Sequence, residues 1–261
     1  MIPDQKIAEW YKLAIKSPDL DRIKTASLRP PVAAFIRNAS RVGVFSWILT
    51  SNITFDFSKG VAEELWERSR LHSDEEKEGF DTLMSAQLVL AWTAFETLAG
   101  DLWEAAINLH HPTLVQKAAE GKSIQIRLLF EKHGFDLRNK MGTVLLDHLD
   151  RPFQSMKSMK KTYQSTFPDG WVSQDSFWDD KDLRSTCSLR NLIVHKASIV
   201  DKKFLEDGKD DGRLLVFKEG HRFYLNGELL AELLTGLFAF SERLIQAVDG
   251  WIDRNAVSVT E

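Results

Sequence analysis

The segment between Glu75 and Leu109 constrains the fold most, because its apolar residues recur every three or four positions. That spacing matches the 3.6-residue turn of an α-helix and not the two-residue alternation of a strand. Acidic residues at the start and Pro112 just beyond the end are typical of helix boundaries. The segment is therefore predicted to form one long helix. Its periodic apolar residues are Phe80, Met84, Leu88, Ala91, Phe95, Leu98 and Leu102.

Similar spacing over most of the remaining chain predicts an all-α protein, built as a helical bundle. A second helix is expected over residues 180–200 and a closing helix over residues 229–252. Alternating apolar and polar residues at 213–225 predict a small β-hairpin before the closing helix. Residues 1–72 are expected to form an N-terminal helical extension and residues 73–261 the main helical domain, without a flexible linker between them.

Composition allows a large core and leaves the partner open. Of the 261 residues, 43% are hydrophobic, including 16 Phe and 8 Trp, which suffices for a substantial core. The net charge of −4 gives no global sign of nucleic-acid binding, but it does not exclude such binding, because a local basic cleft decides it.

Several features predict a cytoplasmic protein that does not contact a membrane. Cys187 is the sole cysteine, which excludes an intrachain disulfide and a cysteine zinc site and fits a reducing compartment. The first residues lack the basic and apolar regions of a secretion signal. The early apolar stretch Val32–Ile53 is interrupted by Arg37, Asn38 and Arg41, so it is interpreted as a buried helix and not as a membrane span.

The helix expected over residues 180–200 carries an Arg190-Asn191 pair followed by His195. Arginine is an always-charged phosphate binder, and histidine titrates near neutral pH. At 3.6 residues per turn, Arg190 falls in line with Cys187 and Val194, on a side that looks buried, so its guanidinium needs an anionic partner. The polar stripe of the same helix comprises Arg184, Ser188, Asn191, His195 and Ser198.

Glu96 on the long helix is the candidate partner for Arg190. It lies in register with Trp92 and Trp103, so it also points into an apolar strip. Pairing the two residues across packed helices would satisfy both charges. The alternative is that the pair is a purely structural ion pair and that His195 is a solvated surface residue.

These residues resemble the HEPN family of helical proteins, whose signature is Arg-x4–6-His. Ala94-Phe95-Glu96 resembles the acidic position of the family's first core helix. Residues 190–195 fit the signature, including the polar residue after the arginine. Residues 198–201, followed by a hairpin and a closing helix, resemble the usual continuation. The resemblance covers roughly residues 75–252.

The resemblance implies a metal-independent endoribonuclease, of the kind that acts as a toxin or antiviral effector and is controlled by an antitoxin or regulatory protein. It also implies a homodimer in which two signature helices line one cleft. His195 would then move protons, Arg190 would hold the phosphate, Asn191 would orient His195 or bind the phosphate, and Glu96 would fix Arg190. Other members of the family are non-catalytic modules that dimerise or bind partner proteins or nucleotides, and this alternative stays open.

A basic run, Lys157, Lys160 and Lys161, lies on a helix predicted over residues 138–163. With Tyr163 nearby, these lysines are candidates for contact with an RNA backbone, although a solvated helix face is the alternative. The sequence has no glycine-rich phosphate loop, metalloprotease motif or nucleophile elbow, so neither a metal nor a cofactor is expected.

Overall fold

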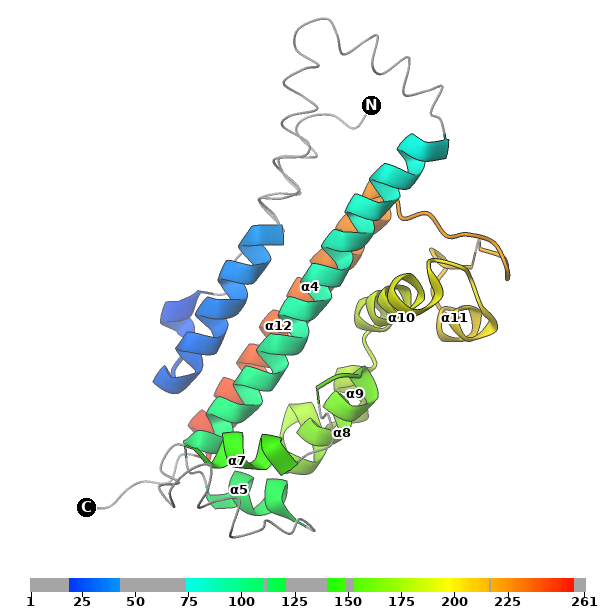
Figure 1. Cartoon of the computed structure of the whole chain (residues 1–261). Helices are drawn as coiled ribbons and strands as arrows, with labels where there is room; N and C mark the ends of the chain where they lie inside the picture. The colour runs from blue at the N-terminus through cyan, green and yellow to red at the C-terminus, as the bar shows by residue number, and fades with distance from the viewer. Residues whose placement is uncertain are drawn as a thin grey trace, which may run out of the picture. The chain divides into compact units, whose positions relative to one another are not determined.

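The computed structural model describes residues 19–42, 74–109, 112–120, 140–148, 153–215 and 217–255. Within these ranges the protein is all-α, as the sequence predicts (Figure 1). A helix covers residues 29–42, and short 3-10 helices cover Leu20–Arg22, Ala26–Leu28 and Trp171–Ser173 (η3). The labelled helices are α4 (Asp74–Asn108), α5 (Pro112–Ala119), α7 (Met141–His148), α8 (Met156–Thr166), α9 (Asp175–Trp178), α10 (Lys181–Lys196), α11 (Lys202–Asp207) and α12 (Gly227–Arg254).

The long helices agree with the apolar periodicity. The segment with the clearest repeat forms α4, and the predicted closing helix forms α12. Among the described residues, no helix has both the length and the apolar character needed to cross a membrane.

The predicted β-hairpin over residues 213–225 is wrong for the part of it that the structure describes, which omits residue 216. Residues 212–215 form turns and no strand. Asp211 causes this, because its carboxylate accepts the backbone N–H of Arg213 at 3.0 Å and its carbonyl accepts that of Leu214 at 2.9 Å. The first half of the expected hairpin is thus held in a turn by a side chain.

The second half of the expected hairpin pairs with a different segment. Arg222 and Ile199 form an isolated antiparallel bridge. Two backbone hydrogen bonds flank it, from Val200 N–H to the His221 carbonyl at 3.0 Å and from Phe223 N–H to the Ser198 carbonyl at 2.7 Å. Residues 198–200, directly after α10, therefore take the place of the expected hairpin partner.

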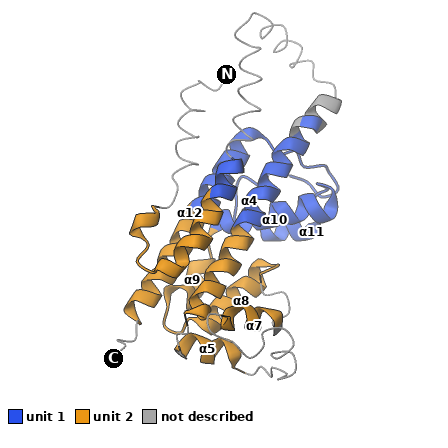
Figure 2. Ribbon diagram, turned by 60° about the vertical axis from the view of Figure 1, so that its left-hand side comes forward, with its two compact units in different colours: residues 1–17, 37–94, 181–238 blue, residues 18–36, 95–180, 239–261 orange. Residues whose placement is uncertain are grey.

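The chain divides into two compact units (Figure 2). Unit 1 comprises Met1–Ser17, Arg37–Ala94 and Lys181–Phe238, and unit 2 comprises Pro18–Ile36, Phe95–Asp180 and Ala239–Glu261. α4 and α12 each contribute their first part to unit 1 and the remainder to unit 2. The boundary expected between residues 72 and 73 lies outside the described residues.

Aromatic side chains fill the core of unit 2. Phe95 of α4 meets Phe240 of α12 edge to face, with ring centroids 5.7 Å apart. Tyr163 is fully buried, and its hydroxyl donates to the Ala99 carbonyl at 2.7 Å, so its polar end is satisfied. The other aromatic members of this cluster are Trp103, Phe153, Phe167, Phe177, Trp178 and Trp251.

α10 and α12 are in close contact in unit 1 at Gly236, which lies inside α12. A Cβ atom at this position would overlap the Cβ, Cγ and Oδ2 atoms of Asp182 in the first turn of α10. The obstacle includes the Cβ of Asp182, which cannot swing aside as a side-chain end can. Glycine at 236 is therefore a packing requirement of the two helices.

We predict that Gly236→Ala lowers the free energy of unfolding by about 1–3 kcal/mol, because α10 must move to admit the methyl group. In an open helix the same change would stabilise by about 1 kcal/mol. Gly250→Ala on the same helix is the matched control, since its Cβ would meet only the end of the Arg254 side chain, at 3.4 Å. Urea unfolding followed by circular dichroism measures both. Equal stability of the two variants would contradict the prediction.

Candidate functional site

α10 carries Arg190, Asn191 and His195, and it exposes His195 to solvent. Leu183, Leu189 and Leu192 are buried and fix the rotation of the helix. His195 lies in the last turn and is exposed, as the polar stripe predicts. The same prediction is wrong for two members of the stripe, Ser188 and Ser198, which are buried.

Arg190 is half-buried and is held by its neighbour on the helix. Its Nη1 donates to Asn191 Oδ1 at 3.0 Å, and its Nε lies in the protein interior. The Asn191 amide nitrogen in turn lies 3.7 Å from the sulfur of Cys187. Asn191 therefore holds the guanidinium of Arg190, and the two roles expected for it, orienting His195 or binding the phosphate, stay predictions.

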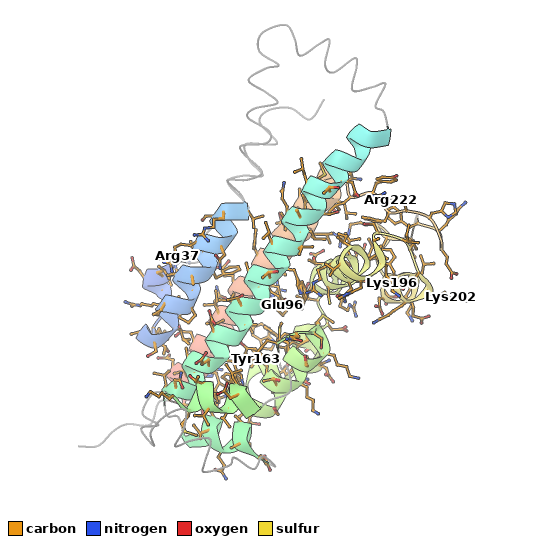
Figure 3. The ribbon with its side chains drawn as sticks, in the orientation of Figure 1. Arg37, Glu96, Tyr163, Lys196, Lys202 and Arg222 are labelled. Carbon is orange, nitrogen blue, oxygen red and sulfur yellow. The ribbon has the colours of Figure 1, made fainter. Side chains whose placement is uncertain are left out.

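Glu96 lies on α4 and is half-buried (Figure 3). It belongs to unit 2, whereas Arg190, Asn191 and His195 belong to unit 1. Each unit is defined by its own internal contacts, so the pairing of Glu96 with Arg190 stays a prediction.

The chain leaves α10 through an unusual turn. Ala197 and Ser198 both adopt left-handed backbone conformations, with φ of 49° and 62°. Each such non-glycine residue costs roughly 1–2 kcal/mol. The Ser198 N–H donates back to the Leu192 carbonyl at 3.2 Å. This turn ends the helix after Lys196, one residue beyond His195, and leads the chain into the bridge with Arg222.

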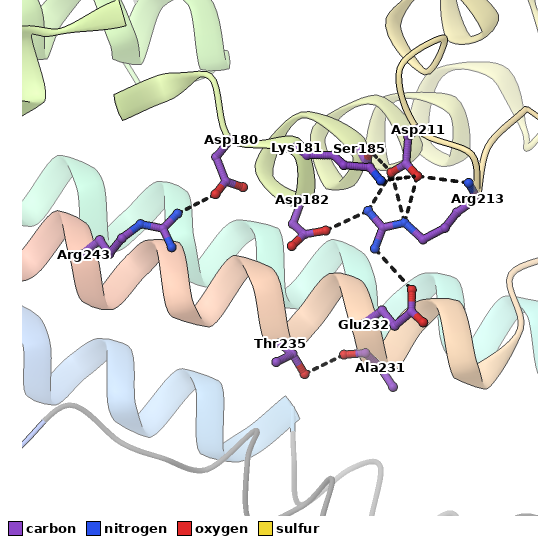
Figure 4. A network of polar contacts seen from close by, with 10 residues as sticks. All are labelled: Asp180, Lys181, Asp182, Ser185, Asp211, Arg213, Ala231, Glu232, Thr235 and Arg243. Carbon is purple, nitrogen blue, oxygen red and sulfur yellow. Dashed lines mark hydrogen bonds and ion pairs between the residues drawn. The ribbon is translucent and has the colours of Figure 1, made fainter. Parts of the chain in front are cut away.

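An ion network around the buried carboxylate of Asp211, which the sequence did not predict, fixes the other end of α10 (Figure 4). The Nε of Arg213 lies 3.0 Å from both carboxylate oxygens of Asp211. Its Nη2 donates to Asp182 at 2.7 Å, and its Nη1 donates to Glu232 of α12 at 3.3 Å. Ser185 also donates to Asp211, at 2.7 Å. One guanidinium thus joins the start of α10, the loop after α11 and the start of α12.

This network changes the pKa of its central acid. Burial alone would raise the pKa of Asp211, but hydrogen bonds from Arg213 and Ser185 outweigh it and hold the pKa well below its usual value. The same hydrogen bond from Arg213 to Asp211 raises the pKa of the guanidinium further. Both groups are therefore charged in the folded protein. The only sequence signal was Asp211-Gly212-Arg213, which is typical of a turn.

The basic run lies in unit 2, on α8. This helix begins at Met156, after Ser155, whose hydroxyl accepts the N–H of Ser158 at 3.1 Å. The Lys160 ammonium is 2.6 Å from the carboxylate of Asp175, so its charge is partly neutralised. Lys157 and Lys161 are exposed. Contact of the three lysines with RNA stays a prediction, weakest for Lys160.

Neither metal ligands nor similarity to known proteins points to a function. In the part of the chain that the structure describes, no group of three or more His, Cys, Asp or Glu side chains is placed to hold a metal ion. Comparisons of the chain with models of known protein families, with curated proteins and with solved structures find no match. Function is therefore inferred from α10 and its surroundings.

We predict that Asp211 stabilises the fold at neutral pH and loses this effect in acid. Its pKa is lower in the folded than in the unfolded chain, where it is about 3.9, so the contribution is complete above about pH 4 and disappears as the pH falls further. Asp211→Asn should lower the free energy of unfolding by roughly 1–3 kcal/mol at pH 7. The difference from the wild type should shrink at about pH 3.

Urea titrations at both pH values measure this difference. The control is Asp210→Asn, which changes an exposed neighbouring carboxylate and should have little effect at either pH. A difference for Asp211→Asn that stays constant from pH 7 to pH 3 would exclude the proposed role of its charge.

Proposed function

We propose that this protein is a metal-independent endoribonuclease of HEPN type that acts as a homodimer. One observation carries the proposal: His195 is exposed at the end of α10, while Arg190 is held on the same helix by Asn191. The biological class that follows is a cytoplasmic toxin or antiviral-defence effector, restrained by an antitoxin or regulatory protein. The fold type, a HEPN-like bundle with an N-terminal extension, is part of the same proposal.

The chemistry requires only groups that these residues supply. The RNA 2′-hydroxyl attacks the adjacent phosphorus while a base removes its proton, and the P–O5′ bond breaks as the 5′-oxygen takes up a proton. Histidine can act as base and as acid near neutral pH, so His195 serves both transfers. Arg190 stabilises the negative phosphorane oxygens through its paired N–H donors. The products are a 2′,3′-cyclic phosphate and a 5′-hydroxyl.

The spacing of the two residues supports a dimer. Arg190 and His195 are five positions apart, which separates them by about 140° around one helix. Within one chain the two side chains therefore diverge. We therefore propose a twofold dimer in which two copies of α10 line one cleft and the Arg190 of one copy acts with the His195 of the other.

A non-catalytic docking module is the second candidate, and a specific observation favours it. Val194 is 47% exposed and Ile199 is 41% exposed, on either side of His195 in the sequence. Exposed apolar side chains of this size can mark a protein contact. Moreover, His195 and Lys196 suit the last turn of a helix on electrostatic grounds alone, because cations are stabilised there. Only a chemical assay separates the two candidates.

We predict that His195→Ala lowers RNA cleavage by about 100- to 10,000-fold, because the proton-transfer group is lost. The side chain is exposed, so its removal opens no cavity and the circular dichroism spectrum should not change. Cleavage of end-labelled RNA by the wild type should continue in EDTA and should leave a 2′,3′-cyclic phosphate.

The matched control is His221→Ala, which removes another exposed histidine of unit 1 and should leave cleavage almost unchanged. Light scattering should give a dimeric mass for the wild type and both variants. Cleavage that persists in His195→Ala would refute the catalytic role. A wild type that cleaves no RNA would leave the docking module as the function.

We also predict that Glu96 and Arg190 are energetically coupled. Both are half-buried, so each single alanine substitution should lower the free energy of unfolding by roughly 1–3 kcal/mol. The double variant should lose less free energy of unfolding than the two single variants together, and the difference should be at least about 0.5 kcal/mol. Glu96→Ala combined with Arg222→Ala is the control, because Arg222 pairs with Asp81. Simple additivity for the Glu96 and Arg190 pair in denaturant titrations would show that the two residues do not interact.

A further inference from the structure

The segments that pair after α10 have one buried face and one exposed face. Ser198 and Val200 are buried on one strand of the bridge, and Phe223 and Leu225 are buried on the other. Ile199, Arg222 and Tyr224, which alternate with these buried residues, are exposed, and Ile199 lies opposite Arg222 in the bridge. Ile199, Arg222 and Tyr224 therefore share one exposed face, which begins four residues after His195. We call it the bridge face.

The aromatic ring on the bridge face is held in place. Tyr224 is 47% exposed, and the guanidinium carbon of Arg222 lies 5.4 Å from the centroid of its ring. Arg222 is itself anchored, since its Nη2 lies 3.9 Å from the carboxylate of buried Asp81. Asp81 also accepts the N–H of Leu225 at 2.7 Å, which fixes the backbone next to Tyr224. The Tyr224 ring therefore faces solvent, with Arg222 against it and a fixed backbone beside it.

Three lysines lie close in sequence to the first segment of the bridge. Lys196 ends α10, and Lys202 and Lys203 begin α11; all three are exposed (Figure 3 labels Lys196, Lys202 and Arg222). Asp201 lies among them, but its carboxylate accepts the N–H of Phe204 at 2.8 Å and lies 3.4 Å from Lys196. Lys202 and Lys203, which directly follow Asp201, are therefore the cations of this segment that we consider for contact with an anionic ligand.

We propose that the bridge face binds single-stranded RNA, with a base stacked on Tyr224 and the backbone phosphates near Lys202 and Lys203. The inference rests on the proposed ribonuclease function, for which it supplies the substrate class. It makes Tyr224 a residue that positions the strand beside His195, without a part in the bond-breaking step.

The combination of groups favours this occupant over others. Exposed aromatic rings flanked by cations hold unstacked bases, each worth a measurable part of the affinity, with little dependence on sequence. A duplex keeps its bases stacked, so it can use the lysines but not the ring. A second copy of this chain would bring the same positive charges against themselves, which opposes contact through this face.

Binding to an uncleavable strand tests the proposal independently of catalysis. The probe is a fluorescein-labelled 2′-O-methyl oligoribonucleotide, which lacks the nucleophile, used as a single strand and as a duplex. Tyr224→Ala should weaken single-strand binding by about 5- to 100-fold in fluorescence anisotropy. Tyr224→Phe should bind like the wild type, because the ring remains. Leu215→Ala is the matched control, since it removes another exposed apolar side chain of unit 1.

Three results would overturn the proposal. The first is equal single-strand binding by the wild type and Tyr224→Ala. The second is an equal loss of duplex binding, because stacking would not then be the cause. The third is a change of mass in light scattering for Tyr224→Ala, which would assign the bridge face to contact between copies.

A parallel assay with unmodified RNA separates this proposal from the proposed function. A wild type that binds single strands through Tyr224 but cleaves none would refute the ribonuclease and support the bridge face. An active wild type whose KM does not rise in Tyr224→Ala would refute the bridge face alone. For the expected enzyme, Tyr224→Ala raises KM on single strands while kcat stays within about twofold, because the loss is uniform binding energy.

Discussion

The arrangement of unit 1 depends on one cation, the guanidinium of Arg213. Three carboxylates surround it, and the most central, Asp211, is almost fully removed from solvent. Removing Arg213 would leave the buried charge of Asp211 uncompensated, so this pair constrains the elements that it joins. α10 is one of them, and it is a rigid rod of about 24 Å. The contact of Arg213 with the first turn of α10 therefore determines where the last turn of the helix places His195.

The sequence predicts the long helices well, because their signal is repeated. α4 and α12 each contain several turns of apolar residues at helical spacing, and errors at single positions do not change the period. The hairpin failed for the opposite reason. The sequences of residues 213–217 and 222–225 both have a pattern typical of strands, but this pattern does not determine which segment each one pairs with. A side-chain acceptor at Asp211 and a segment far upstream decided the pairing.

The sequence was enough to find Arg190, Asn191 and His195, because they lie on one helix. It was not enough to predict the segments that surround them. The predicted helix continued to residue 200, whereas Ala197 and Ser198 turn left-handed and end it after Lys196. Positions beyond that point follow a strand period, so Ser198 faces the interior and Ile199 faces solvent. The ion pair of Lys160 with Asp175 joins two helices, and no local spacing predicts such a contact.

The net charge of −4 is weak evidence against an RNA partner, because many acids are engaged internally. Asp211 is buried around Arg213, and Asp81 is buried beneath Arg222. In unit 2, Asp249 accepts the backbone N–H groups of Lys24 and Thr25 at 2.9 Å and 2.8 Å. Acids placed in this way bind the protein's own donors, whereas Lys202 and Lys203 at the start of α11 face solvent. An anionic ligand responds to the local field at that surface and not to the formal total.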